Sequence, residues 1–359
     1  MSVISKRFRL LGSPTLVLTA SFQLFTQTPC TSITEPTSMN PFYSLTTPRG
    51  QLTATHVVHL TNAWVGGLVP GLAGPVYRVR ETMSAQRPGR ALQFQAIGND
   101  ETKKKSHEQR SYIFFDSPEQ KGFDYLTQLP DGEHELMFGG GREAFSDMDA
   151  QHGQVCGPAS RGMYDVHSAA HVSGALPVYF GASNWGAEGI RVSAAEGDDI
   201  DGQSRSPWAA GRVKALWSGV LSESVDEFPW VGRIPRAISG RRSPTPGVMV
   251  SEKGKRVRTA DPGEWVAAGY SGEGMVHAWL CTRALALMVL GLDNARDMEA
   301  EGRHGAGQTV DEWFPACYRI SVVRWKNACQ EWNRGSKSLK GGRIAMRGGA
   351  GRMKIYHGI

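Results

Sequence analysis

The stretch of this sequence that best suits a ligand-binding turn contains three closely spaced glycines, Gly269, Gly272 and Gly274. They end an apolar run that predicts a strand, and an almost wholly apolar run that predicts a helix follows them. Glycines let a ligand approach the backbone, and the start of a helix offers unpaired N–H groups and a positive dipole end. Because Met275 stands where a phosphate-binding loop has lysine, we expect a planar ligand with partial negative charge. A turn that only packs a helix closely against a strand explains the spacing as well.

Other residue types that could carry chemistry are weaker candidates. His167 and His171 have helical spacing, but no carboxylate or cysteine is placed in the sequence to complete a metal site, so no metal is expected. Ser218 lacks the preceding glycine of a hydrolase nucleophile turn. The sequence therefore identifies no catalytic residue.

Composition and charge restrict the classes of protein further. The chain has 359 residues and a formal net charge of +6, which is modest for its length and gives little reason to expect a nucleic-acid partner. Five separated cysteines without a CxxC pair suit a reducing compartment, so a cytoplasmic location is expected. The N-terminal basic and apolar residues weakly resemble a signal peptide, yet no run is long enough to span a membrane. The oligomeric state stays open.

The elements that must position the glycine turn can be read from hydrophobic patterns. Alternation predicts a strand over 23–33, a hairpin turning at Pro48-Arg49-Gly50, and a buried strand in "THVVHL". From residue 76 to 235 short apolar runs separated by turn residues predict a largely antiparallel sheet. The basic, low-complexity residues 332–359 are expected to be disordered.

Several longer stretches occur in the order that is expected of one protein family. They include "HVVHLTNAWVGGLVPGL", "FDYLTQLPDGEHELMFGGG", "VKALWSGVLSESVDEFPWVGRIP" and "GEWVAAGYSGEGMVHAWL". In this combination they resemble the FAD-dependent oxidoreductases of the D-amino-acid oxidase, glycine oxidase and sarcosine oxidase type, in a form common in fungi. The resemblance covers about residues 22 to 328.

This resemblance implies a cofactor and the residues that contact it. The glycine turn would lie against the pyrimidine side of the flavin ring, where the helix N-terminus stabilises the negative charge of the reduced ring. The turn "LTNAW" would pass the cofactor with its backbone, and "TPCTSI" would contact adenine. No cysteine stands just before the glycine turn to attach flavin covalently, so any FAD is noncovalent, and its retention is left open. The implied cofactor-binding residues are Cys30, Thr61, Asn62, Gly269, Gly272, Gly274 and Met275.

Two further positions bear on the substrate. Asp226 matches the family's Asp…Pro…Gly turn, and a role in capping that turn is favoured over a chemical one. Relatives of the glycine-oxidase kind hold the substrate carboxylate with an arginine shortly after "SG", whereas Val220 and Leu221 stand here. Arg80, Arg142 or Lys214 could replace that arginine in space.

The family's first strand–GxGxxG–helix unit, which binds the pyrophosphate, has no match in this sequence. The expected fold class is α+β or α/β, with an incomplete, Rossmann-like FAD-binding domain interleaved with an antiparallel-sheet substrate domain. The FAD-binding domain would comprise 1–74, as a truncated N-terminal part, and 247–331, and the substrate domain 75–246. The implied function is oxidation of a C–N bond of a small amine or amino acid by hydride transfer to flavin. The alternative is an inactive, truncated remnant without stable FAD binding.

Overall fold

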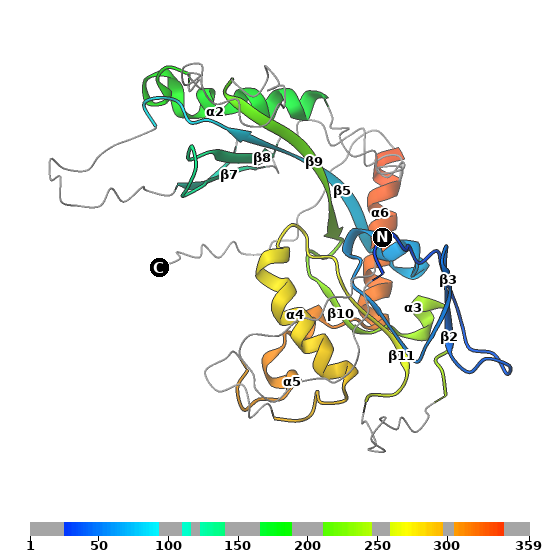
Figure 1. Cartoon of the computed structure of the whole chain (residues 1–359). Helices are drawn as coiled ribbons and strands as arrows, with labels where there is room; N and C mark the ends of the chain where they lie inside the picture. The colour runs from blue at the N-terminus through cyan, green and yellow to red at the C-terminus, as the bar shows by residue number, and fades with distance from the viewer. Residues whose placement is uncertain are drawn as a thin grey trace, which may run out of the picture. The chain divides into compact units, whose positions relative to one another are not determined.

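The structure is a computed structural model that describes residues 25–92, 110–115, 123–140, 166–188, 211–245, 259–296 and 305–340. The chain divides into two compact units, one formed by Met1–Arg78 with Ser222–Ile359 and the other by Val79–Leu221 (Figure 1). The boundaries placed from sequence were 74/75 and 246/247, so the chain returns to the first unit earlier than expected. The assignment of FAD and substrate to these units stays a prediction.

The first unit contains a three-stranded sheet with the order β10-β11-β4. Its central strand β11 (Gly263–Ala268) is buried along its whole length, because it has a neighbour on each side and cover on both faces. Strand β4 (His56–His59) pairs with β11 in parallel, and β10 (Trp230–Arg233) pairs with it antiparallel. Strand β4 lies at an edge of this sheet. Only one face of the predicted buried strand is covered: Val57 and His59 are buried and Val58 is exposed.

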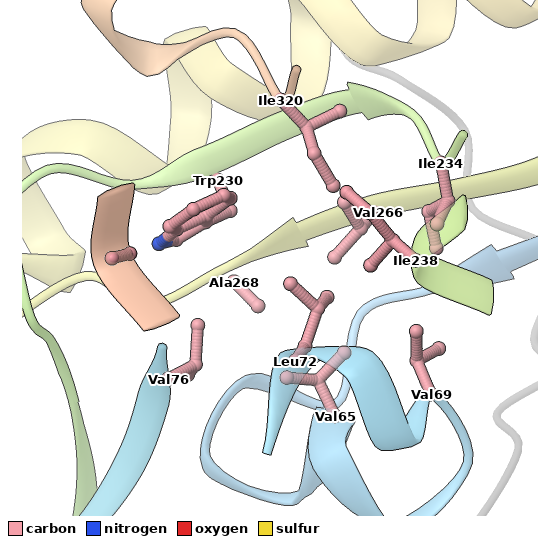
Figure 2. Packing of buried hydrophobic residues seen from close by; sticks show 11 residues of the cluster. Val65, Val69, Leu72, Val76, Trp230, Ile234, Ile238, Val266, Ala268 and Ile320 are labelled. Atoms are coloured by element: carbon pink, nitrogen blue, oxygen red, sulfur yellow. The ribbon is translucent and has the colours of Figure 1, made fainter. Parts of the chain in front are cut away.

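Side chains of β11 alternate between two cores, as the pleat of a strand requires. Val266 and Ala268 join a cluster of eleven buried side chains that also contains Trp230 and Leu72 (Figure 2). Trp265 and Ala267 face the opposite way and pack against helix α4 (Gly274–Val289). The strand that ends at the glycine turn is therefore fixed from both sides.

Short elements complete this unit. A second sheet is formed by β1, β2 and β3, and the register of β2 and β3 confirms the hairpin predicted at Pro48-Arg49-Gly50. The expected strand over 23–33 is reduced, among described residues, to the start of β1. The remaining elements are β1 (Ser32–Thr34), β2 (Tyr43–Thr47), β3 (Gly50–Ala54), η1 (Asn62–Gly67), η2 (Pro70–Leu72), α3 (Arg236–Ser239), α5 (Val310–Trp313), η4 (Ala316–Tyr318) and α6 (Val322–Lys340).

Helix α6 corrects one expectation. It continues to Lys340 and so includes the first part of the segment for which disorder was predicted from residue 332. Its basic, glycine-poor stretch up to Arg334 continues an amphipathic helical pattern, and that pattern outweighs the low apolar content. The predicted tail beyond Lys340 and the N-terminal segment before residue 25 lie outside the described residues.

The second unit is built on a five-stranded sheet with the order β6-β7-β8-β5-β9. The pairs β5–β8, β6–β7 and β7–β8 are antiparallel, which confirms the predicted antiparallel sheet. Helix α2 (Val166–Trp185) covers one face of this sheet (Figure 1). The strands are β5 (Val76–Gln86), β6 (Ser111–Phe114), β7 (Asp124–Gln128), β8 (Leu136–Gly140) and β9 (Val213–Ser224).

Proline 177 lies inside α2 and explains a group of buried polar contacts. Because proline has no N–H, the carbonyl of Ser173 one turn earlier loses its helical partner. Arg212 donates to that carbonyl at 2.7 Å from Nη2. Gln86 Nε2 donates to the neighbouring carbonyl of Val172 at 2.5 Å, so the sheet satisfies the carbonyls exposed near the break.

No helix within the described ranges is both long enough and apolar enough to cross a membrane.

Candidate functional site

The glycine turn joins the end of β11 to the start of α4, as the sequence predicts. Gly269 and Gly272 have φ of 79° and 82°, a region that favours glycine. A Cβ on Gly269 would also come within 3.0 Å of Trp230 Cδ1, so packing requires glycine there as well. Gly274 is different, because its φ is not positive and the nearest atom to an added Cβ is 4.0 Å away. The protein itself leaves the space beside Gly274 open.

A second turn, Leu60 to Asn62 after β4, is tied directly to the glycine turn. Asn62 has a left-handed φ of 44°, which asparagine tolerates, and its Oδ1 accepts a hydrogen bond from the backbone N–H of Gly269 at 3.0 Å. Ser222 Oγ donates to the same Oδ1 and accepts from the N–H of Tyr270 at 3.3 Å. The structure therefore brings Asn62 and Gly269 together, and Asn62 acts by holding the turn.

Ser222 was not singled out from the sequence. It is buried at the end of β9, where Ser222 and Ser224 alternate in an otherwise largely apolar strand. That alternation is the one sequence signal for a polar role. Its partner Asn62 is 160 residues away, so only the fold shows which turn it supports.

Thr61 carries a polar atom that the described part of the chain does not satisfy. Its Oγ1 is buried and has no hydrogen-bond partner among the described residues. A buried hydroxyl without a partner costs about 1–3 kcal/mol. A ligand group placed between the two turns could accept or donate this hydrogen bond.

Helix α4 begins without a side-chain cap. Glu273 is the residue before its first turn and makes no capping hydrogen bond, so the helix start offers backbone N–H groups and a positive dipole end. The carboxylate of Glu273 instead pairs with His277 one turn later, at 2.8 Å. A ligand with partial negative charge is the kind that this helix end would stabilise.

Helix α4 forms where the sequence predicts it, but its apolar run is not buried all round. Cys281, Ala284, Leu285 and Met288 are buried, but one face carries exposed apolar side chains. Met275 is fully exposed, and Val276 and Trp279 are 70% and 74% exposed. Hydrophobic spacing alone could not separate these two faces, because both are apolar.

Cys30 lies elsewhere in the unit. It packs against the cluster of Ile33, Tyr43 and Val57, and its Sγ donates to the carbonyl of Ser32 at 3.4 Å. Burial raises the pKa of its thiol above the usual value. None of these contacts within the described residues belongs to the two turns, so the structure does not bring Cys30 to the glycine turn.

Asp226 is fully engaged in holding its own turn. Its carboxylate accepts hydrogen bonds from Ser224 Oγ at 2.7 Å, from Arg324 Nε and Nη2 at 2.7 and 2.9 Å, and from the N–H of Phe228 at 3.4 Å. Burial alone would raise the pKa of Asp226, but the hydrogen bonds from Arg324 and Ser224 outweigh it and hold that pKa below its usual value. A structural role is supported over a chemical one.

The opposite end of β11 carries a buried ion network that the sequence did not reveal. Glu264 accepts hydrogen bonds from Arg241 Nε and Nη2 at 2.8 and 2.7 Å, and its Oε2 lies 2.9 Å from His59 Nε2. Burial would raise the pKa of Glu264, but the bonds from Arg241 and His59 hold it below its usual value. The network links β4, β11 and the segment after α3.

In the second unit, polar groups lie between helix α2 and the sheet. Asp124 Oδ2 is 2.6 Å from both His171 Nε2 and Tyr179 Oη. No three histidine, cysteine or carboxylate side chains are grouped as metal ligands in the part of the chain that the structure describes. The proposed stand-ins for a substrate arginine are also engaged: Lys214 pairs with Glu133 and Glu135, and Arg80 Nη1 donates to Ser218. Arg142 lies outside the described residues.

Comparison with known proteins places the chain in a family. The family model described as FAD dependent oxidoreductase, DAO, matches residues 17–288. Similar solved structures include glycine oxidase from Geobacillus kaustophilus (17% identity, TM-score 0.42, covering 84% of this chain and 54% of that one) and the amino acid oxidase NikD (14% identity, TM-score 0.41, covering 78% and 54%). L-amino acid deaminase from Proteus vulgaris is 11% identical with a TM-score of 0.37, covering 74% and 46%. The chain thus spans about half the length of these structures, and a search of curated proteins found no match.

The chain belongs to the FAD-dependent oxidoreductase family of the D-amino-acid oxidase type, because the family model matches well over half of it. The expected family and the mixed fold class with antiparallel sheets are confirmed. The cofactor that this family implies is FAD. Two features of the described residues are compatible with a flat polar ligand: Thr61 Oγ1 lacks a hydrogen-bond partner, and an added Cβ on Gly274 would meet no atom closer than 4.0 Å.

Proposed function

We propose that this chain carries the flavin-ring half of an FAD site, in an oxidoreductase that oxidises a C–N bond of a small amine or amino acid. The observation that carries the proposal is the pair of turns. One is fixed by Asn62 and Ser222, and beside it lie a buried hydroxyl without a partner and a glycine that the protein's own packing does not require. When bound, FAD supplies the acceptor for the hydride that leaves the amine-bearing carbon.

The chain's own residues have distinct parts in this proposal. Gly274 and Met275 present backbone N–H groups at the start of α4, and the positive end of the helix favours negative charge on the ring. Thr61 offers its hydroxyl, while Asn62, Gly269 and the left-handed Gly272 shape the turns. Cys30 contacts the adenine end through its backbone, and FAD is held noncovalently.

The class of substrate is narrowed by what the sequence lacks. Val220 and Leu221 occupy the positions where an arginine would hold a carboxylate, and both Lys214 and Arg80 already have partners in the second unit. This arrangement favours an amine substrate over a simple amino acid held at those positions.

The second candidate is a protein of this family without stable FAD binding and without activity. Two observations favour it. Met275, Val276 and Trp279 are exposed beside the proposed ring site, and the 359-residue sequence contains no GxGxxG motif for the pyrophosphate. Both candidates use the same fold and differ in whether the cofactor is retained.

The discriminating experiment measures bound flavin directly. The 359-residue chain is purified, its cofactor is released with acid, and flavin absorbance is divided by protein concentration. A ratio near one FAD per chain supports the proposal, and a ratio near zero that persists after incubation with FAD supports the second candidate.

A matched pair of variants tests whether the ring lies where we propose. Thr61→Val removes the unsatisfied hydroxyl, so it should leave stability unchanged or raised while it weakens FAD binding roughly fivefold, as for loss of a hydrogen bond of about 1 kcal/mol. Thr53→Val, on the exposed strand β3, is the control and should change neither quantity. Equal FAD affinity for both variants would remove Thr61 from the site.

A further inference from the structure

Arg324, on the first turn of helix α6, makes several hydrogen bonds to the segment that leads into β10. Its Nε and Nη2 donate to the two carboxylate oxygens of Asp226, Nη1 donates to the carbonyl of Pro229 at 2.9 Å, and Nη2 also donates to the carbonyl of Phe228 at 2.7 Å. The guanidinium lies over the ring of Trp230, 3.9 Å from its centroid. Its side chain is only 12% exposed, so these contacts are largely shielded from water.

The segment 226–230, which Arg324 contacts, supports the glycine turn. Trp230 is fully buried, and its Cδ1 lies where a Cβ on Gly269 would approach to 3.0 Å, so its ring packs directly against that glycine. Trp230 Nε1 donates to Ser224 Oγ at 2.8 Å, and Ser224 Oγ donates to Asp226. The backbone N–H of Ser224 donates to Ser271 Oγ, inside the turn itself, at 3.1 Å.

We propose that Arg324 is a positioning residue for the glycine turn: it fixes Asp226 and Trp230, which in turn fix Gly269 and Ser271. The inference rests on the proposed function, because it concerns how the turn is held ready for the flavin ring. Two parallel paths run from Arg324 to the turn, one through the Trp230 ring and one through Asp226 and Ser224. A planar fork with several donors is needed for both paths at once, and lysine does not supply one.

A role limited to docking α6 predicts something different. In that case loss of Arg324 loosens the helix and the whole unit together. A positioning role predicts a change concentrated in the turn. Trp265 and Val266 of β11 should be unaffected, because they pair with β4 on one side and with the part of β10 beyond Trp230 on the other. Hydrogen exchange separates the two. The N–H of Ser224 donates to Ser271 Oγ on the path from Arg324, and the N–H of Tyr270, which donates to Ser222 Oγ, lies in the turn between Gly269 and Ser271.

The test compares Arg324→Met and Arg324→Lys with Arg296→Met, which removes a different and exposed ion pair to Glu312. In the purified chain without added cofactor, Arg324→Met should speed exchange at Tyr270 and Ser224 at least tenfold relative to the amides of Trp265 and Val266. Arg324→Lys should give a smaller increase and Arg296→Met none. Unchanged exchange in the turn, or an equal increase in the turn and in β11, overturns the proposal. If Arg324→Met does not fold, the same comparison with Arg324→Lys decides.

A second measurement links the turn to its ligand. FAD titration of the same variants should show at least tenfold weaker binding for Arg324→Met, a partial loss for Arg324→Lys, and wild-type affinity for Arg296→Met. Wild-type protein that binds no FAD refutes the proposed function and leaves the exchange result to decide the role of Arg324. Normal FAD affinity in a folded Arg324→Met variant refutes the positioning role.

Discussion

Replacing Gly274 by aspartate should separate the stability of the protein from its affinity for flavin. Gly274 opens helix α4, has no positive φ, and has only Tyr270 Cβ, at 4.0 Å, near an added Cβ. A carboxylate at a helix N-terminus is favourable by about 0.3–1 kcal/mol. The exposed carboxylate of Glu273 next to it reduces that gain through like-charge repulsion. We therefore expect a free energy of unfolding equal to or slightly above that of the wild type.

The effect on flavin has the opposite sign. The new carboxylate occupies the space in which the ring would lie, and it opposes the negative charge that reduction places on the ring. Two like charges about 4 Å apart repel by about 1 kcal/mol in water and about 4 kcal/mol at an effective dielectric constant of 20. The lower figure alone makes the two-electron potential more negative by roughly 20 mV. Steric exclusion weakens binding of the oxidised cofactor as well.

The assay combines urea unfolding, FAD titration and a measurement of flavin potential in the reconstituted protein. Gly174→Asp is the matched control, because Gly174 is an exposed helical glycine in the second unit with no atom near an added Cβ. Gly274→Asp with wild-type affinity and potential would show that the ring does not lie against α4. A large loss of stability would show that the space beside Gly274 is not open.

Three other changes test the fold. Glu264→Gln should lower the free energy of unfolding at pH 7 by about 3–5 kcal/mol, because Arg241 is left without its charge partner. The pKa of Glu264 in the folded protein lies below its unfolded value of about 4.3. Its contribution to the free energy of unfolding is therefore complete above about pH 5 and is lost as the pH falls through the folded pKa. The free energy of unfolding of the variant, measured with urea, should depend less on pH in the acid range than that of the wild type. Gly71→Ala places a Cβ against the backbone carbonyl oxygen of α3 and should cost about 1–3 kcal/mol in the same assay, whereas Gly174→Ala should not destabilise. Deleting residues 341–359 should leave the melting temperature unchanged, and a fall of many degrees would show that this segment stabilises the fold.

The sequence predicted those features that depend on local pattern. The strand–turn–helix around Gly269, the hairpin at Pro48-Arg49-Gly50 and the antiparallel sheet all follow from alternation, turn residues and glycine spacing. The chain returns to the first unit at Ser222, earlier than the 247 expected for the second FAD-binding segment, because β10 pairs with β11.

Features that depend on distant partners could not be read in this way. Glu264 and Arg241 appear in the sequence as ordinary charges, and only the sheet shows that they form a buried pair with His59. Likewise, the exposed face of α4 has the same apolar composition as its buried face. Composition decides which side chains can be buried, but the neighbours that a helix meets decide which of them are buried.

The structure divides the proposed cofactor residues into two kinds, and the division has an experimental consequence. Asn62 and Gly269 are bound to each other and to the protein around them, so substitutions there should change stability and flavin affinity together. The Thr61 hydroxyl has no hydrogen-bond partner among the described residues, the space beside Gly274 is open, and the Met275 side chain is fully exposed. Substitutions at these positions should therefore change flavin affinity with little loss of stability. Loss of a residue that supports the turns lowers the stability of the protein even without cofactor. Loss of a residue that only contacts the ligand lowers ligand affinity, because its group makes few contacts in the cofactor-free protein. If both groups of variants lost stability equally, the two turns would be packing elements only, which is the interpretation that glycine spacing alone left open.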